Sequence, residues 1–234
     1  MKNDAPIWFF DSGIGWKTTL EETRKLLPNE NYIYFADSKN NPYWDKSDEE
    51  IFLLVKDWVD FLIKKWSKII VLACNTATSI CVYKIRNIYK DIPIIWAVPA
   101  LKVAIDKYKN QNILIMATPA TINSEKFLHF YYTYPNSNIK LLSCPNLANL
   151  IENNKENEID KYLQDILKDY KNTDIVVLGC THYIYIKENI RKYLPDVEFI
   201  DWNDWIARQT KKVLEEKGLL SQKEDKGDVV IYNS

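Results

Sequence analysis

The chain has 234 residues, of which 47% are hydrophobic and 27% are charged, and its formal net charge is −1. This balance is typical of one large or two small globular domains, and it gives no support to a nucleic-acid-binding or anionic-membrane-binding protein. The chain begins without the long apolar stretch of a secretory signal, and no apolar run reaches the roughly 20 residues of a membrane helix. We therefore expect a cytoplasmic protein with no membrane partner, whose four cysteines are catalytic, metal-binding or inert.

The first part of the chain predicts strands that alternate with helices. Helices are predicted at 18–28, from Ser47 to about Trp66, and from Asn75 or Thr76 onward. Asn75 and Thr76 are the candidate N-caps of the third helix. Ser47 followed by Glu50 is a capping-box pattern. The apolar runs that predict strands lie at 6–10, 31–37, 68–74 and 92–100.

The same alternation then starts again. Helices are predicted at 103–109, 122–134, 156–170, 183–195 and 205–218, the last ended by Gly218. Strands are predicted at 112–118, 139–146, 174–180, 198–201 and 227–233. Strands that alternate with helices indicate parallel βαβ units, and two rounds of the pattern predict two similar α/β domains with mostly parallel central sheets.

Polar side chains follow several of the predicted strands at their carboxyl ends, where ligands bind in open parallel sheets. These candidates are Asp11, Ser12, Asp37, Cys74, Asn75, Thr76, Thr118, Cys180, Thr181 and His182. If the two domains face each other, both cysteines would line one cleft.

Two of the strand ends, "IVLACNTAT" and "VVLGCTHYI", place Cys74 and Cys180 in equivalent positions. Two thiols on opposite faces of one carbon can remove a proton from one side and return a proton to the other, which inverts the centre. One thiol must be ionised, and an ordinary thiol has a pKa of ~8.5, so it needs a partner near neutral pH. Asp11 could relay the proton of Cys74, and His182 that of Cys180.

These residue types also have common structural roles that involve no catalysis. A single cysteine at a strand end is most often a buried packing residue, and Cys81 and Cys144 are predicted to be such residues. His129 is predicted to lie on a helix surface or to pack. The chain has no CxxC motif and only two histidines, so no metal site is predicted, and the lack of a GxSxG elbow argues against a hydrolase.

The motifs also resemble a known family in an ordered set that spans nearly the whole chain. The matching pieces are "FFDSGIG" (9–15), "YFAD" (34–37), "NPYW" (41–44), "LACNTAT" (72–78), "VPALK" (98–102), "ATPAT" (117–121), "CPNLANLIE" (144–152) and "LGCTHY" (178–183). They resemble the aspartate/glutamate racemase superfamily, and within it the glutamate racemases. The pair "ACNTAT" and "GCTHY" at this separation is the most specific part of the match.

The resemblance implies a cofactor-independent racemase that interconverts L- and D-glutamate by a two-base proton transfer. Cys74 and Cys180 would be the acid and base, Asp11 and His182 would assist them, and Asp37 and Glu152 would be further acidic groups. Substrate contacts would fall on Ser12, Pro42, Tyr43, Asn75, Thr76, Thr121 and Thr181, with Trp44 contributing through its backbone.

The resemblance further implies two α/β domains related by pseudo-twofold symmetry, with the active site in the cleft between them. The first domain would comprise 1–97 and 206–234, and the second 98–205. D-glutamate would be supplied for peptidoglycan, and thus for cell wall biogenesis and cell shape. Homodimers are frequent in the family, and no nucleic acid or cofactor is required.

The chain departs from the family pattern where large residues replace small ones. Trp16 follows "DSGIG", Trp44 follows "NPY", Ile184 follows "CTHY", and Trp202 follows "ID". Trp44 keeps two alternatives open: a racemase of aspartate or another amino acid, and a catalytically silent homologue that acts as a binding protein. A redox thiol pair is a more remote alternative, since racemase geometry would hold the thiols beyond disulfide reach.

Overall fold

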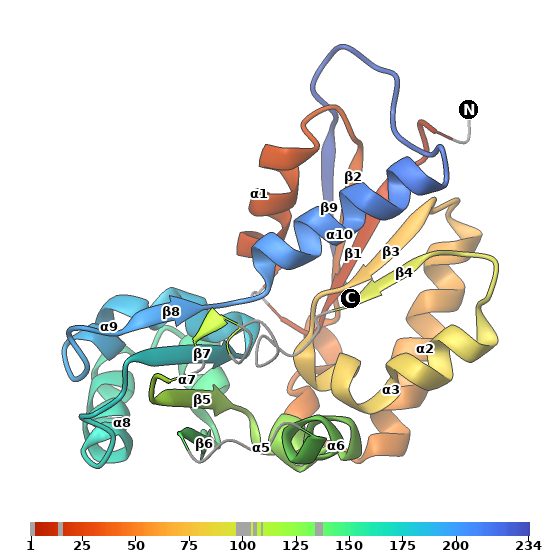
Figure 1. Cartoon of the computed structure of the whole chain (residues 1–234). Helices are drawn as coiled ribbons and strands as arrows, with labels where there is room; N and C mark the ends of the chain where they lie inside the picture. The colour runs from red at the N-terminus through yellow and green to blue at the C-terminus, as the bar shows by residue number, and fades with distance from the viewer. Residues whose placement is uncertain (1–2, 14–15, 97–103, 105–106, 109, 134–137) are drawn as a thin grey trace. The chain divides into compact units, whose positions relative to one another are not determined.

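The computed structural model describes residues 3–13, 16–96, 104, 107–108, 110–133 and 138–234, which group into two compact units (Figure 1). Unit 1 comprises Met1–Ala97 and Trp202–Ser234, and unit 2 comprises Val98–Asp201. The sequence put the return to the first domain at residue 206, whereas the contacts put it at Trp202, where the chain enters a helix. The other boundary and the "VPALK" motif lie outside the described residues.

Unit 1 contains a five-stranded sheet in the order β4-β3-β1-β2-β9, and all of its described strand pairs are parallel. The strands are β1 Ile7–Asp11, β2 Tyr32–Ala36, β3 Ile69–Leu72, β4 Ile94–Trp96 and β9 Val229–Asn233. β9 comes from the end of the chain and pairs with β2 at the sheet edge, with Ala36 opposite Asn233. Two segments distant in sequence therefore complete one sheet.

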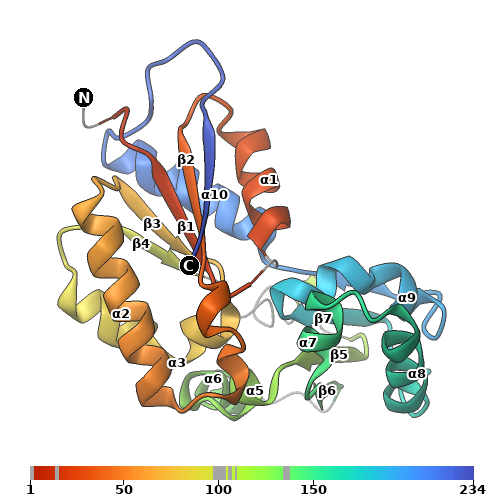
Figure 2. The same cartoon turned by 180° about the vertical axis from the view of Figure 1, so that it is seen from behind.

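Helices cover both faces of this sheet, as continuous apolar strands predict. α2 (Asp48–Lys64) and α3 (Asn75–Ile88) bury apolar side chains against Trp8, Phe10 and Leu72 on one face. α1 (Trp16–Leu26) packs beside α10 (Asn203–Glu216) on the other face, as Figures 1 and 2 show from opposite sides.

Three predicted helix ends can be compared with the structure. The capping box of Ser47 and Glu50 is present at the start of α2, and Gly218 follows α10 with a positive φ of 61°, so both predictions are confirmed. The predicted cap of α3 at Asn75 or Thr76 is wrong. Cys74 occupies the N-cap position, with extended backbone angles, because Asn75 is already helical.

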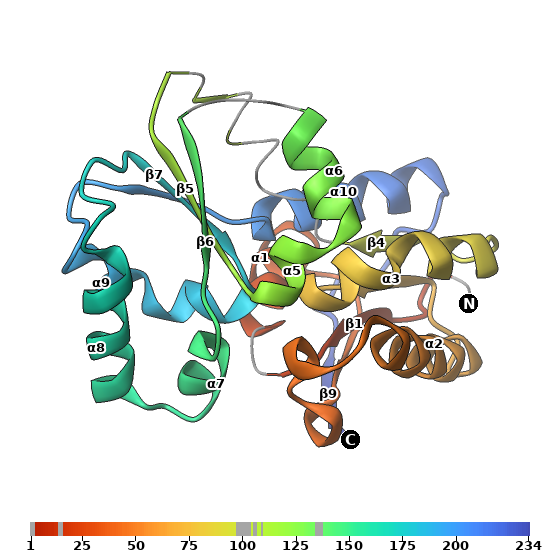
Figure 3. The same ribbon diagram turned by 90° about the horizontal axis from the view of Figure 1, so that it is seen from below.

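Unit 2 contains a four-stranded parallel sheet in the order β6-β5-β7-β8. Its strands are β5 Ile113–Ala117, β6 Ile139–Ser143, β7 Ile175–Gly179 and β8 Glu198–Ile200. α7 (Leu147–Glu152), α8 (Glu156–Leu167) and α9 (Lys187–Arg191) form a packed group, in which α8 lies beside α9 (Figure 3). The two sheets confirm the predicted class of two parallel α/β units.

The predicted helix 122–134 is two helices, α5 (Pro119–Asn123) and α6 (Glu125–Thr133). Ser124 has extended backbone angles, and its Oγ donates to Thr121 O and accepts from Phe127 N. One serine thus ends the first helix and caps the next, a local competition that apolar periodicity does not reveal. The short helix α7 was not predicted, and the predicted helix 183–195 begins as the 3₁₀ helix η3 (Thr181–Ile186).

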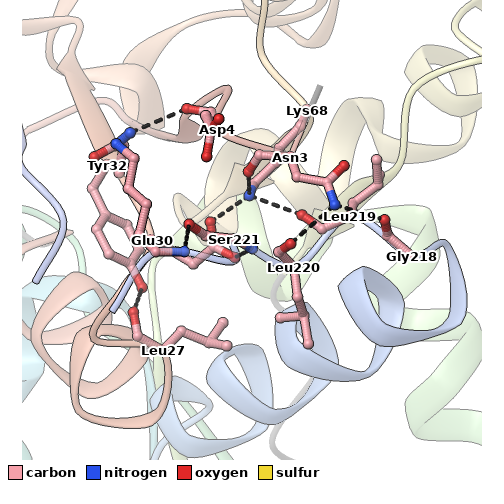
Figure 4. Close-up of polar contacts among 12 residues, drawn as sticks. Asn3, Asp4, Leu27, Glu30, Tyr32, Lys68, Gly218, Leu219, Leu220 and Ser221 are labelled. Carbon is pink, nitrogen blue, oxygen red and sulfur yellow. Dashed lines mark hydrogen bonds and ion pairs between the residues drawn. The ribbon is translucent and has the colours of Figure 1, made fainter. Parts of the chain in front are cut away.

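A buried ion pair lies at the base of unit 1, which is the end of the sheet opposite the candidate site (Figure 4). The Lys68 ammonium contacts the Glu30 carboxylate and also donates to Asn3 O and Leu219 O at 2.6 and 2.9 Å. Glu30 Oε1 accepts from Ser221 N at 2.8 Å. These contacts join four chain segments at the end of the sheet opposite the strand ends that carry the candidate site.

None of the helices in the described part of the chain is long and apolar enough to cross a membrane.

Candidate functional site

Cys74 lies where β3 gives way to α3, and only 5% of its surface is exposed. Its position at the helix N-terminus favours an anion, because the first amide groups of a helix have no partner within it. The Ser12 hydroxyl lies 3.3 Å from Cys74 Sγ. The residue that follows β1 therefore places a hydroxyl group within hydrogen-bond distance of this thiol, and either atom can be the donor.

Asp11 and Ser12 stand at the carboxyl end of β1, and both are buried. Asp11 Oδ1 accepts from Gly13 N at 3.2 Å, which fixes the carboxylate in the turn after the strand. The predicted group of Asp11, Ser12 and Cys74 is thus connected by direct contacts within unit 1.

Asp37 directly follows β2 and holds Tyr43, which belongs to the 3₁₀ helix η2 (Tyr43–Asp45). The Tyr43 hydroxyl donates to Asp37 Oδ2 at 2.7 Å, and Asn40 Nδ2 donates to both carboxylate oxygens at 2.9 and 3.0 Å. Burial and the bond to Asp37 raise the pKa of Tyr43 far above its usual value, so its hydroxyl remains a donor. Pro42 is the N-cap of η2, and Trp44 is half-buried within it.

Asn75 and Thr76 form the first turn of α3, and the buried Asn75 Nδ2 has no hydrogen-bond partner among the described residues. A buried donor of this kind is rare in folded proteins. An anionic group at this helix terminus would satisfy it.

Cys180 of unit 2 follows β7 and begins a chain of three side chains. Cys180 Sγ lies 3.5 Å from His182 Nδ1, and His182 Nε2 makes a short contact with Glu152 Oε2 at the end of α7. Cys180 and His182 are almost wholly buried, whereas Glu152 is partly exposed. A thiol, an imidazole and a carboxylate in this order can pass a proton from a buried sulfur toward the surface.

Threonines also follow two neighbouring strands of unit 2, β5 and β7. Thr118 caps α5, with its hydroxyl 3.0 Å from that of Thr121, and Thr181 is buried directly after Cys180. Their hydroxyl groups can hold a polar ligand at this edge.

The remaining cysteines have packing roles in the structure. Cys81 Sγ donates to Ala77 O within α3, and burial raises the pKa of Cys144 to about 12. Among the described residues, no group of three or more His, Cys, Asp or Glu side chains could hold a metal ion.

Sequence reasoning missed two groups that support the site. Asn40 holds Asp37, and its signal was a hydrogen-bonding amide three residues after the carboxylate in a turn-rich segment. Tyr183 donates from its buried hydroxyl to Cys144 O, which joins the segments that follow β6 and β7. The connection depends on sheet order, and the sequence around Tyr183 carries no sign of it.

No family model matches the chain. Among curated proteins, it is 45% identical over 239 residues to glutamate racemase of Clostridium botulinum, covering 100% of this chain and 93% of the relative. It is 44% identical to glutamate racemase of Clostridium kluyveri, covering 99% and 92%.

Solved structures of glutamate racemases are also similar to this chain. Glutamate racemase of Francisella tularensis in complex with D-glutamate superposes with a TM-score of 0.85 at 32% identity, covering 99% of this chain and 88% of that one. Escherichia coli glutamate racemase in complex with L-glutamate and the activator UDP-MurNAc-Ala gives a TM-score of 0.82 at 28% identity, covering 96% and 89%.

Proposed function

Because the chain belongs to the glutamate racemase family of isomerases, we propose that it interconverts L- and D-glutamate by cofactor-independent proton transfer at the α-carbon. Structures of relatives that hold D-glutamate and L-glutamate support this substrate. The observation that carries the proposal is the Cys180–His182–Glu152 chain, a proton-handling arrangement directly after a strand end.

Cys74 and Cys180 are the proposed acid and base. The thiolate of one removes the α-proton and becomes a thiol, and the thiol of the other donates its proton to the opposite face and becomes a thiolate. The product is the mirror image of the substrate, and the reverse reaction exchanges the two roles. His182, oriented by Glu152, stabilises the thiolate of Cys180. Asp11 and Ser12 assist proton transfer at Cys74.

Substrate binding is assigned to polar groups at the strand ends. Asn75 Nδ2 and the first amides of α3 suit a carboxylate. The other proposed contacts are Ser12, Pro42, Tyr43, Trp44, Thr76, Thr121 and Thr181, and Asp37 acts through its bond to Tyr43. Hydroxyl and amide donors of this kind bind two carboxylates without a buried arginine.

The test is racemisation of L-glutamate in heavy water without pyridoxal phosphate. We expect loss of optical activity together with one deuterium at the α-carbon of the inverted product. A protein that leaves both the optical activity and the α-proton unchanged would be the silent homologue, and the proposal would fail.

Single substitutions test the two-base assignment. Cys74→Ser and Cys180→Ser should each lower the racemisation rate by roughly 10³-fold or more, because a hydroxyl is a far weaker acid than a thiol. The matched control is Cys81→Ser, in which the new hydroxyl can keep the bond to Ala77 O. Full activity in either active-site variant would refute the assignment.

Substrate preference and biological role need separate measurements. Turnover of D-aspartate faster than that of D-glutamate would favour the aspartate alternative that Trp44 keeps open. A role in peptidoglycan supply predicts that the gene relieves the D-glutamate requirement of an auxotrophic bacterium, whereas the Cys74→Ser variant does not. A homodimer would show twice the 27.6 kDa chain mass in light scattering.

A further inference from the structure

The turn after β2 has an unusual cap. Asp37 is the N-cap residue of the 3₁₀ helix η1 (Ser38–Asn40), yet its side chain makes no capping hydrogen bond. An aspartate at this position ordinarily accepts from the second or third amide of the helix. Here the carboxylate accepts instead from the side-chain amide of Asn40 and from the Tyr43 hydroxyl.

The acceptor for the second amide of η1 is instead a residue of the C-terminal segment. Lys39 N, the second amide of η1, donates to Ser234 Oγ at 2.8 Å. Ser234 N donates in turn to Ala36 O at 3.0 Å, so both groups of this serine bond the backbone that flanks Asp37. The parallel pairing of β9 with β2 delivers Ser234 to this position, and Figure 2 shows β9 running to the C-terminus.

Both oxygens of the Asp37 carboxylate are already engaged, by the Asn40 side-chain amide and by the Tyr43 hydroxyl. If this carboxylate turned back to cap Lys39 N, the Tyr43 hydroxyl would lose the acceptor it now has at 2.7 Å. Asp37 and Tyr43 are both fully buried, so the hydroxyl would be left without water as a substitute. Because loss of a buried partner costs more than loss of an exposed one, the carboxylate stays with Tyr43, and Lys39 N takes its acceptor from Ser234.

We propose that Ser234 is a positioning residue for substrate binding: its hydroxyl caps η1 from outside and leaves Asp37 to hold Tyr43. The inference rests on the proposed racemase function, in which Tyr43 contacts glutamate. It assigns the last strand of the chain a role at the site in addition to completing the sheet.

Ser234→Ala is the test. The KM for glutamate should rise about fivefold with kcat unchanged, since a typical N-cap contribution is lost from a group that binds substrate. Exchange of the Lys39 amide with solvent should speed up, and the NMR signals of the Tyr43 ring should shift. Ser234→Thr keeps the hydroxyl and should restore all three readouts.

Ser221→Ala is the matched control in the segment that leads to β9. Its hydroxyl also accepts from a backbone amide, Lys223 N at 3.3 Å, but at the base of unit 1. This variant should keep the KM, the Lys39 exchange rate and the Tyr43 signals of the parent.

The outcomes separate the two proposals. A parent protein that does not racemise glutamate contradicts the proposed function, while the Lys39 and Tyr43 signals of Ser234→Ala still decide whether Ser234 holds the turn. An active parent whose Ser234→Ala variant has unchanged KM overturns the positioning role, even if Lys39 exchange is faster. Unchanged Tyr43 signals would likewise show that Asp37 does not depend on the external cap.

Discussion

Cys74 and Cys180 have chemically different neighbours, although both follow a buried parallel strand. Cys74 contacts the neutral hydroxyl of Ser12, whereas Cys180 contacts the imidazole of His182, which is held by Glu152. The proposed reaction needs each thiol to act as acid in one direction and as base in the other. Each side of the reaction thus has its own means of stabilising the ionised sulfur.

The carboxylate behind His182 can be tested by itself. Glu152→Gln keeps the size of the side chain and removes its charge, so the imidazole loses the partner that favours its protonated form. We expect the racemisation rate to fall by about 10²-fold. Glu158→Gln, on the surface of the adjacent helix α8, should retain full activity, and equal rates for both variants would exclude a role for Glu152.

Trp66 illustrates a local cost at a single residue. It has a positive φ of 65° and is 83% exposed, and it ends α2 in the geometry that Gly218 adopts after α10. In both places the two bonds of a Schellman motif close the helix, for instance Ser67 N to Leu62 O. A side chain at this position strains the backbone, which glycine avoids.

Trp66→Gly should therefore raise the free energy of unfolding by about 0.5–1 kcal/mol, measured from urea denaturation. Trp66→Ala is the control, because it removes the ring and keeps the strained backbone, and it should change stability little. A lower urea midpoint for the glycine variant would show that the exposed ring stabilises the fold.

At the scale of elements, the strand before Cys180 depends on a close approach between neighbours. A Cβ added to Gly179 in β7 would lie 2.5 Å from Ala117 Cβ and 2.6 Å from Met116 O in β5. The two strands cannot keep their spacing with any larger residue. Glycine thus sets the place of the thiol that follows it.

Gly179→Ala should lower the free energy of unfolding by about 1–3 kcal/mol and reduce activity, since β7 must move away from β5 and carries Cys180 with it. The contrasting variant is Gly218→Ala, where an added Cβ meets no described atom beyond its chain neighbours within 4 Å and only the positive φ opposes the substitution. Gly218→Ala should lose stability without losing specific activity. Wild-type stability in Gly179→Ala would contradict the steric argument.

The Lys68–Glu30 pair joins elements at the base of unit 1, and its burial lowers the pKa of Lys68. Lys68→Met leaves the Glu30 carboxylate buried without its cation, so we expect a loss of about 3–5 kcal/mol in unfolding free energy. Lys68→Met combined with Glu30→Gln should recover part of that loss. If the double variant is less stable than Lys68→Met, the buried charge is not the cause.

At the scale of the whole molecule, the two units differ in continuity. Unit 2 is one stretch of chain, whereas unit 1 needs β9 and α10 from the last segment to complete its sheet and to cover α1. A buried hydrogen bond of 2.6 Å from Thr19 Oγ1 to Asn203 Oδ1 links the two parts. Independent folding should therefore be a property of unit 2.

A fragment of residues 98–201 should fold alone and show a cooperative unfolding transition by circular dichroism. A fragment of residues 1–97 should not, because the β2 edge and the inner face of α1 stay uncovered. Adding a peptide of residues 202–234 should restore its structure. Cooperative unfolding of 1–97 without the peptide would contradict this account.

The sequence by itself determined the class of fold and the identity of the candidate groups. Continuous apolar strands and their polar ends depend on local pattern, which is why two parallel α/β units, the Ser47 cap and the Gly218 stop were predicted and confirmed. The catalytic and substrate-binding roles of the site residues stay predictions, supported by contacts within each unit.

Only the tertiary structure decided which of these groups touch. The Glu152–His182 contact depends on how α7 packs beside η3. Ser234 lies 195 residues from the amide it caps. Local periodicity carries no information about such pairs, because sheet order and helix packing bring them together only when the chain has folded.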